Sequence, residues 1–230
     1  YSKDLPRPEK FTERPFVQST KIYDRTGKIL LYEFYGEEKR EIIPLSEVPA
    51  NLKNALISTE AAKFYSHRGS DIEAIFRSIL ADIKLMRPAF GASTISQQLI
   101  RSTFLTREKT IKRKIREIIL ALEMERRYSK DQILEWYINQ IPFGPNIYGA
   151  ESASQAYFSK QTKDLSLNES AVLAALIQMP SYYSPYGQHK DELIARKNYV
   201  LDRMAAEHYL NKEEAKAAKK EEVKFASIGS

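Results

Sequence analysis

The chain has 230 residues, of which 43% are hydrophobic and 29% are charged, so it is long enough to bury a core of its own. It contains no cysteine, which excludes disulfides, zinc–thiolate sites and thiol nucleophiles. Its net charge is +6, and its 8 glycines and 10 prolines are too few for a fibrous or low-complexity polymer.

Residues 1–20 are polar and carry three prolines, and we expect them to be a tether that follows an absent membrane anchor. Residues 21–43 favour β structure, because short runs of β-branched and aromatic residues alternate with turn-forming residues. The sequence therefore predicts a small N-terminal β element, with strands at 22–23 and 29–35 and a third short strand at 41–43.

From residue 50 onwards, the spacing of apolar residues is helical. We expect helices over about 52–68, 71–86, 111–122 and 191–208, and helices that start at a Ser93 cap and at capping boxes 129–132 and 166–169. A breaker-rich loop at 141–149 is expected to lead into a short helix that ends at residue 158. Residues 206–230 are rich in Lys, Glu and Ala, and we expect a charged tail without core residues. The predicted fold class is mainly α, one helical lobe with a small N-terminal β element.

Positive charge is concentrated in residues 101–130, where ten basic residues stand against four acidic ones. This segment alone equals the excess of the whole chain. Such a segment attracts polyanions, for example nucleic acid, an anionic bilayer or a phosphorylated substrate. A solvated helix face is the more frequent explanation, so charge alone leaves these alternatives open.

Glu60 is the first candidate for chemistry. Counted from Leu52 at 100° per residue, it lies about 80° round its predicted helix, at the margin of the apolar face. A carboxylate at such a margin suits a general base or a general acid. The alternative is a boundary glutamate that pairs with a cation such as Lys63.

Glu117 is the second candidate, with Arg113 and Lys114 one helical turn before it. The apolar stripe predicted on the same helix consists of Ile111, Ile115, Ile118 and Leu122. Glu117 lies away from that stripe, so an exposed ion pair is one interpretation. The other is a carboxylate held among cations where an anionic leaving group would also bind.

Residues 91–98, with the sequence GASTISQQ, place small and hydroxyl residues before a predicted helix N-terminus. Free backbone N–H groups and the helix dipole favour an anion at such a position. The Gly-Lys-Ser/Thr ending of a Walker loop is absent. His67 has no second histidine at ligand spacing, so we expect a packed or hydrogen-bonding side chain rather than a metal ligand.

In chain order, these segments resemble the five motifs of glycosyltransferase family 51, the peptidoglycan polymerase domain of class A penicillin-binding proteins. The segments that carry the resemblance are EAAKFYSHRG at 60–69, GASTISQQL at 91–99, RKIRE at 113–117, ILEWYIN at 133–139 and ESAVLAALIQMP at 169–180. The similarity covers about residues 20–205.

The resemblance implies a lysozyme-like, largely helical fold and the polymerisation of lipid II into β-1,4 glycan strands, with inversion and release of polyprenyl pyrophosphate. It implies that Glu60 is the general base and that Glu117 organises the donor pyrophosphate, directly or with a divalent cation (Mg or Mn). The residues expected to bind sugar and pyrophosphate are Lys63, Phe64, His67, Ser93, Thr94, Gln97, Gln98, Arg101, Arg113, Lys114 and Asn139.

The sequence departs from the family pattern at two places. Ala61 stands where the family has an aspartate directly after the first glutamate. Pro145-Asn146 stand where the family has a glycine shortly after Phe143-Gly144.

By the same resemblance, residues 21–205 form the glycosyltransferase domain and act at the outer face of a bacterial cytoplasmic membrane. The implied partners are lipid II, the growing glycan strand and the membrane surface, and not nucleic acid. The chain has no transpeptidase motif. If the parent protein has a transpeptidase domain, we expect it to begin after residue 230.

Two other functions stay open. A lysozyme-like enzyme that cleaves glycans would also use one acid, but its neutral leaving group requires no basic segment. A non-catalytic membrane-surface or nucleic-acid binding domain would use only the basic helix, and its affinity would fall steeply with salt.

Overall fold

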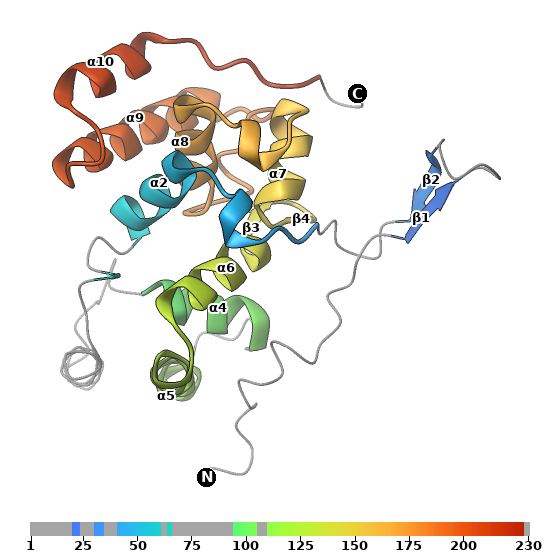
Figure 1. Ribbon diagram of the computed structural model, residues 1–230, viewed down its shortest axis with the longest axis vertical. Coiled ribbons are helices and arrows are strands. Elements are labelled where there is room, and N and C mark those ends of the chain that lie inside the picture. Colours follow the sequence, from blue (N-terminus) through green and yellow to red (C-terminus); the bar gives the residue numbers. More distant parts are fainter. Residues whose placement is uncertain are drawn as a thin grey trace.

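The core of the protein is built around helix α8 (Leu167–Leu176). The computed structural model describes residues 20–23, 30–34, 41–60, 64–65, 94–104 and 110–227. Residues 168–176 of α8 are all buried, as expected for a helix that is largely apolar on every side. It packs against α2 (Ala50–Glu60) and α9 (Lys190–Ala206), which also contact each other (Figure 1). The predicted helical class is confirmed.

A second group of helices lies beside this core and consists of α4 (Ile95–Phe104), α5 (Ile111–Arg127) and α6 (Lys130–Gln140). Helix α4 packs against both α5 and α6 (Figure 1). It buries Ile95, Leu99 and Ile100, as their spacing predicts. No helix among the described residues has the length and hydrophobicity needed to cross a bilayer.

The predicted apolar stripe of α5 is confirmed in part. Ile118 is buried and Leu122 packs on the core, but Ile115 is 38% exposed. The buried face also includes Glu117, Ala121 and Met124, and Lys114 bonds both to Glu117 and to Gln97 on α4.

Side chains cap most of these helices at their first turn. The capping boxes at Ser129 and Ser166 are both present, as predicted. At α4, however, Thr94 rather than Ser93 is the cap, because its Oγ1 accepts from the Gln97 N–H at 3.2 Å. Helix α2 is shorter than predicted, since Phe64 and Tyr65 already form a turn. The helix predicted at 71–86 lies outside the described residues.

Within the described ranges, the β structure consists of two hairpins. Strands β1 (Thr20–Tyr23) and β2 (Leu30–Phe34) pair antiparallel, which confirms the predicted hairpin. The third strand is wrong, because residues 41–43 form no strand. The predicted loop at 141–149 contains β3 (Pro142–Gly144) and β4 (Ile147–Tyr148), joined through Asn146 at a φ of 56°. Asparagine tolerates this left-handed conformation better than most residues do. This explains how Pro145-Asn146 can stand where the family pattern has a glycine.

The C-terminal segment is part of the core, so the expectation of a tail without core residues is wrong. Helix α10 (Lys212–Lys220) buries Ala215 and Ala218 and packs on α9. Beyond it, Phe225 stacks on Phe158 at the end of α7 (Ala150–Phe158), with 5.8 Å between ring centroids. The remaining short elements are the 3-10 helices η1 (Leu45–Glu47) and η2 (Thr162–Asp164).

Asn139 holds the segment before α2 against α6. Its Nδ2 donates to the carbonyls of Ile43 (2.8 Å) and Glu135 (2.9 Å), and its Oδ1 accepts from the Ile43 N–H (3.0 Å). The side chain is 2% exposed, and its amide is engaged inside the protein. These hydrogen bonds stabilise the fold, and the expected contact between Asn139 and substrate stays a prediction.

Replacing Asn139 with alanine should leave the buried backbone groups of Ile43 unpaired and lower the free energy of unfolding by about 2 to 4 kcal/mol. Urea denaturation measures this loss. A variant as stable as the original protein would show that the three hydrogen bonds contribute nothing.

Candidate active site

Glu60 is the last residue of α2, and α9 holds that end of the helix in place. The Nε of Arg203 on α9 donates to the Ser58 carbonyl at 3.2 Å, and its other end pairs with Glu207 at 2.8 Å. An arginine that satisfies a free carbonyl at a helix C-terminus stabilises the last turn. The backbone that carries the Glu60 side chain is therefore tied to the core.

The Glu60 carboxylate is bonded to α4. It accepts a hydrogen bond from Nε2 of Gln98, and Oε1 of the same amide accepts from the Tyr137 hydroxyl at 3.1 Å. Tyr137, on α6, is fully buried. Burial raises the pKa of its hydroxyl well above the ordinary value; nearby Glu60 raises it further and Arg101 lowers it. Three helices thus meet at the predicted general base.

A second carboxylate, Glu117, lies in a cluster of cations. Lys114 donates to it directly, and Arg113 lies 3.5 Å from its other oxygen. Glu117 has no exposed surface, whereas the side chains of Lys114 and Arg113 are 23% and 18% exposed. Burial of a carboxylate is costly unless it has such partners. Glu117 therefore holds the two cations, and they rather than Glu117 face solvent.

Two successive residues of α4 connect the carboxylates. Gln98 donates to Glu60, and the preceding Gln97 accepts from Lys114 at 3.1 Å. Since successive helical residues point about 100° apart, one helix can serve both groups. Glu60 on one side and the Lys114–Glu117 pair on the other are thus attached to a single rigid turn.

Phe64 packs in the core, and its expected contact with substrate stays a prediction. It is 3% exposed, and Nζ of Lys130 lies 4.6 Å from its ring centroid. The adjacent Tyr65 donates to Asp131 at 2.7 Å. Both residues therefore fix the segment after α2 to the first turn of α6.

The other predicted residues fall into two groups. Thr94 caps α4, and Arg101 lies on the same helix with an exposed side chain. Lys63, His67 and Ser93, and also Ala61, lie outside the described residues. The structure thus brings together six of the predicted residues, which are Glu60, Gln97, Gln98, Arg113, Lys114 and Glu117.

Sequence analysis missed Tyr137 and Arg203. Tyr137 falls on the buried side of α6, where a tyrosine is usually a core residue, and its sequence gives no sign that the hydroxyl has a polar partner. Arg203 lies 145 positions from Ser58, so no local pattern predicts their contact.

A divalent cation does not fit the groups at Glu117. Its oxygens lie against Lys114 and Arg113, so a metal ion would have to displace positive charge. Among the described residues, no three His, Asp or Glu side chains are placed to hold a metal ion. We therefore derive no chemical step from a metal, and the Mg or Mn ion stays a prediction.

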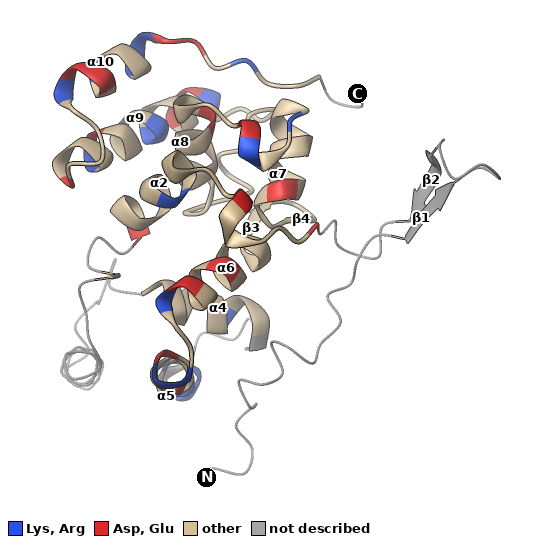
Figure 2. Cartoon of the chain, viewed as in Figure 1, with Lys and Arg blue, Asp and Glu red and all other residues tan. Residues whose placement is uncertain are grey.

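Lys and Arg make up much of α5 (Figure 2). Lys112, Arg116, Arg126 and Arg127 are exposed, whereas Arg113 and Lys114 are turned partly inward to Glu117. The predicted basic segment thus has two parts. Its inner part belongs to the candidate site, and its outer part is a charged surface.

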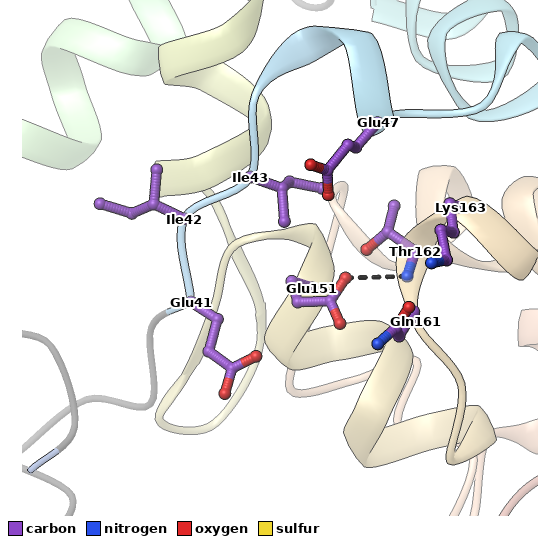
Figure 3. A pocket seen from close by; sticks show the side chains of 8 residues that line it. All are labelled: Glu41, Ile42, Ile43, Glu47, Glu151, Gln161, Thr162 and Lys163. Carbon is purple, nitrogen blue, oxygen red and sulfur yellow. Dashed lines mark hydrogen bonds between the residues drawn. The ribbon is translucent and has the colours of Figure 1, made fainter. Parts of the chain in front are cut away.

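The described residues also line a hollow of about 140 Å³ that is separate from this set (Figure 3). Within it, Glu151 accepts from the Thr162 N–H at 2.8 Å. The hollow is lined by Glu41, Ile42, Ile43, Glu47, Glu151, Gln161, Thr162 and Lys163. None of these is a predicted site residue, so the hollow has no part in the candidate active site.

Comparison with known proteins gives concordant matches. The family model described as Transglycosylase matches residues 27–205. The chain is 40% identical over 216 residues to penicillin-binding protein 1A of Aquifex aeolicus, covering 94% of this chain and 29% of that protein. It is 44% identical over 200 residues to penicillin-binding protein 1A of Clostridium tetani, covering 84% of this chain and 25% of that protein.

A solved structure gives the same result for the fold. The crystal structure of penicillin-binding protein 1A from Haemophilus influenzae superposes with a TM-score of 0.53 at 26% identity. The superposition covers 94% of this chain and 22% of that one. The chain thus spans less than a third of the length of the relatives that it matches.

Proposed function

This chain belongs to the transglycosylase family of peptidoglycan glycosyltransferases, and from that premise we propose that it polymerises lipid II into β-1,4 glycan strands. One observation carries the proposal. A single turn of α4 binds the Glu60 carboxylate through Gln98 and the Lys114 ammonium through Gln97. Attack by a sugar hydroxyl with loss of a pyrophosphate needs both a base and nearby cations.

Glu60 is the general base in this proposal. Its carboxylate accepts the proton of the acceptor's 4-hydroxyl as the oxygen attacks C1 of the donor sugar. The bond between C1 and the pyrophosphate oxygen breaks as the new C1–O bond forms, so the anomeric centre inverts. The hydrogen bond from Gln98 orients the carboxylate for this step.

Lys114 and Arg113 stabilise the departing pyrophosphate. Cations aimed at the position where negative charge develops lower the barrier, and they are most effective when they are held in place before the reaction. Glu117 acts through them as a positioning residue, because it has no surface of its own to offer a substrate.

The place of action follows from the same proposal. Lipid II is anchored in a membrane by its polyprenyl chain, so we place the domain at the outer face of the cytoplasmic membrane. The exposed basic residues of α5 suit an anionic bilayer surface. The relatives are longer than this chain, which is consistent with a transpeptidase domain elsewhere in the parent protein.

Purified protein incubated with lipid II tests the proposal. We expect growth of glycan polymer and release of polyprenyl pyrophosphate, with no clearance of finished peptidoglycan. A lysozyme-like enzyme would give the opposite pair of results. A binding domain would give neither, and its attachment to the membrane would fall steeply with salt.

A further inference from the structure

We propose that Tyr137 is a positioning residue for the general base, because its hydroxyl fixes which end of the Gln98 amide faces Glu60. The inference rests on the proposed function of Glu60 as the base. Tyr137 itself touches no reacting atom. It acts through Gln98, which lies between the tyrosine hydroxyl and the carboxylate.

A glutamine amide has two ends of opposite character. Its Oε1 can only accept hydrogen bonds and its Nε2 can only donate them. Here Oε1 accepts from Tyr137 at 3.1 Å, and Nε2 donates to Glu60. In this orientation the amide supports an ionised carboxylate, which is the form that can take a proton.

The reversed amide would be penalised at both ends. Its oxygen would face a carboxylate oxygen, so two acceptors would meet. At the other end, the Tyr137 hydroxyl hydrogen would lose Oε1 of Gln98, the acceptor that it has among the described residues. Tyr137 is 0% exposed, so water cannot replace that acceptor, and a buried donor without a partner is costly.

The tyrosine also stays a donor. Its buried position raises the pKa of the hydroxyl, which favours the protonated form that donates to Gln98. The charged groups near it are Glu60, which raises this pKa, and Arg101, which lowers it. The orientation of Gln98 is consequently set by the hydrogen bond that this hydroxyl donates.

Replacing Tyr137 with phenylalanine should lower the kcat of polymerisation about ten-fold and leave the KM for lipid II unchanged. The matched control is Tyr157→Phe. Tyr157 is also buried, at 2% exposed, and donates to the Phe143 carbonyl at 3.0 Å, away from Glu60. Both variants should melt at similar temperatures, but only Tyr137→Phe should lose kcat.

A double-mutant cycle with Gln98 separates positioning from general destabilisation. In a Gln98→Met background, Tyr137→Phe should cause no further loss of kcat, because there is no amide left to orient. This double variant also removes the unpaired amide oxygen, so it folds even if the single variant does not. A loss of equal size in both backgrounds, or an unchanged kcat in Tyr137→Phe, would overturn the proposal.

One measurement does not depend on activity. The side-chain amide protons of Gln98 should exchange with solvent faster in Tyr137→Phe than in the original protein or in Tyr157→Phe, as followed by NMR. If lipid II is not polymerised at all but this exchange difference is found, the proposed function fails while the orienting contact stands. Equal exchange in all three proteins would overturn the contact itself.

Discussion

Replacing Glu60 with glutamine is expected to lower glycan polymerisation about 10³-fold. Glutamine has the same shape and its carbonyl oxygen can still accept from Gln98, so the hydrogen-bond chain to Tyr137 should persist. What is lost is the ability to take a proton. Turnover of lipid II and binding of lipid II should therefore separate, with turnover nearly abolished and binding retained.

The control for this prediction is Glu123→Gln, which removes the same charge from an exposed ion pair with Arg127 on α5. It should leave polymerisation unchanged. If Glu60→Gln still turned over at the original rate, Glu60 would not be the base. If it lost donor binding as well, its role would be structural or electrostatic rather than proton transfer.

The second large effect is expected when Lys114 and Glu117 are both replaced with glutamine. Single replacements would leave a buried charge without its partner, so a loss of activity could simply reflect unfolding. The double variant removes one charge of each sign and keeps the net charge. We expect thermal stability to change little and polymerisation to fall about 100-fold, because Lys114 no longer stabilises the leaving pyrophosphate.

An exposed pair on the same helix is the matched control. Nη2 of Arg127 lies 2.6 Å from Oε1 of Glu123. The two side chains are 46% and 37% exposed, so the pair lies in solvent. Replacing both with glutamine removes the same charges from α5 without touching α4. Equal losses in the two double variants would mean that the basic helix acts through its overall charge and not through a site at Gln97.

The sequence predicted the helices best where their signals are local. The capping boxes at Ser129 and Ser166 and the buried residues of α4 depend on neighbours within one or two turns, and the structure agrees. Helix α10 was missed because its apolar stripe consists of small alanines among Lys and Glu. Their burial depends on how closely α9 approaches, which the segment itself does not encode.

Helix α5 shows a second limit. Isoleucines at 111, 115 and 118 predict one buried face, yet Ile115 is exposed and Glu117 is buried. A sequence pattern assigns charged residues to the outside. Here Glu117 is buried beside Lys114, which bonds to Gln97 on α4, and the periodicity of the segment does not encode such a tertiary contact.

The candidate site was predicted in part for the same reason. The motif resemblance supplied Glu60, Gln98 and Glu117, but it does not distinguish residues that contact substrate from those that support them. Asn139 and Phe64 belong to the same motifs and are used inside the protein. The contact between Gln98 and Tyr137 joins two residues that are 39 positions apart and belong to different motifs.

The central claim is that Glu60 and the Lys114–Glu117 pair serve one reaction at one bound donor. The most direct measurement is a crystal structure of the Glu60→Gln variant with lipid II bound. The account predicts the donor pyrophosphate against Lys114 and Arg113, and the side chain of residue 60 within hydrogen-bond distance of a sugar hydroxyl. A pyrophosphate bound elsewhere, with Lys114 still bonded to Gln97 and Glu117, would contradict it.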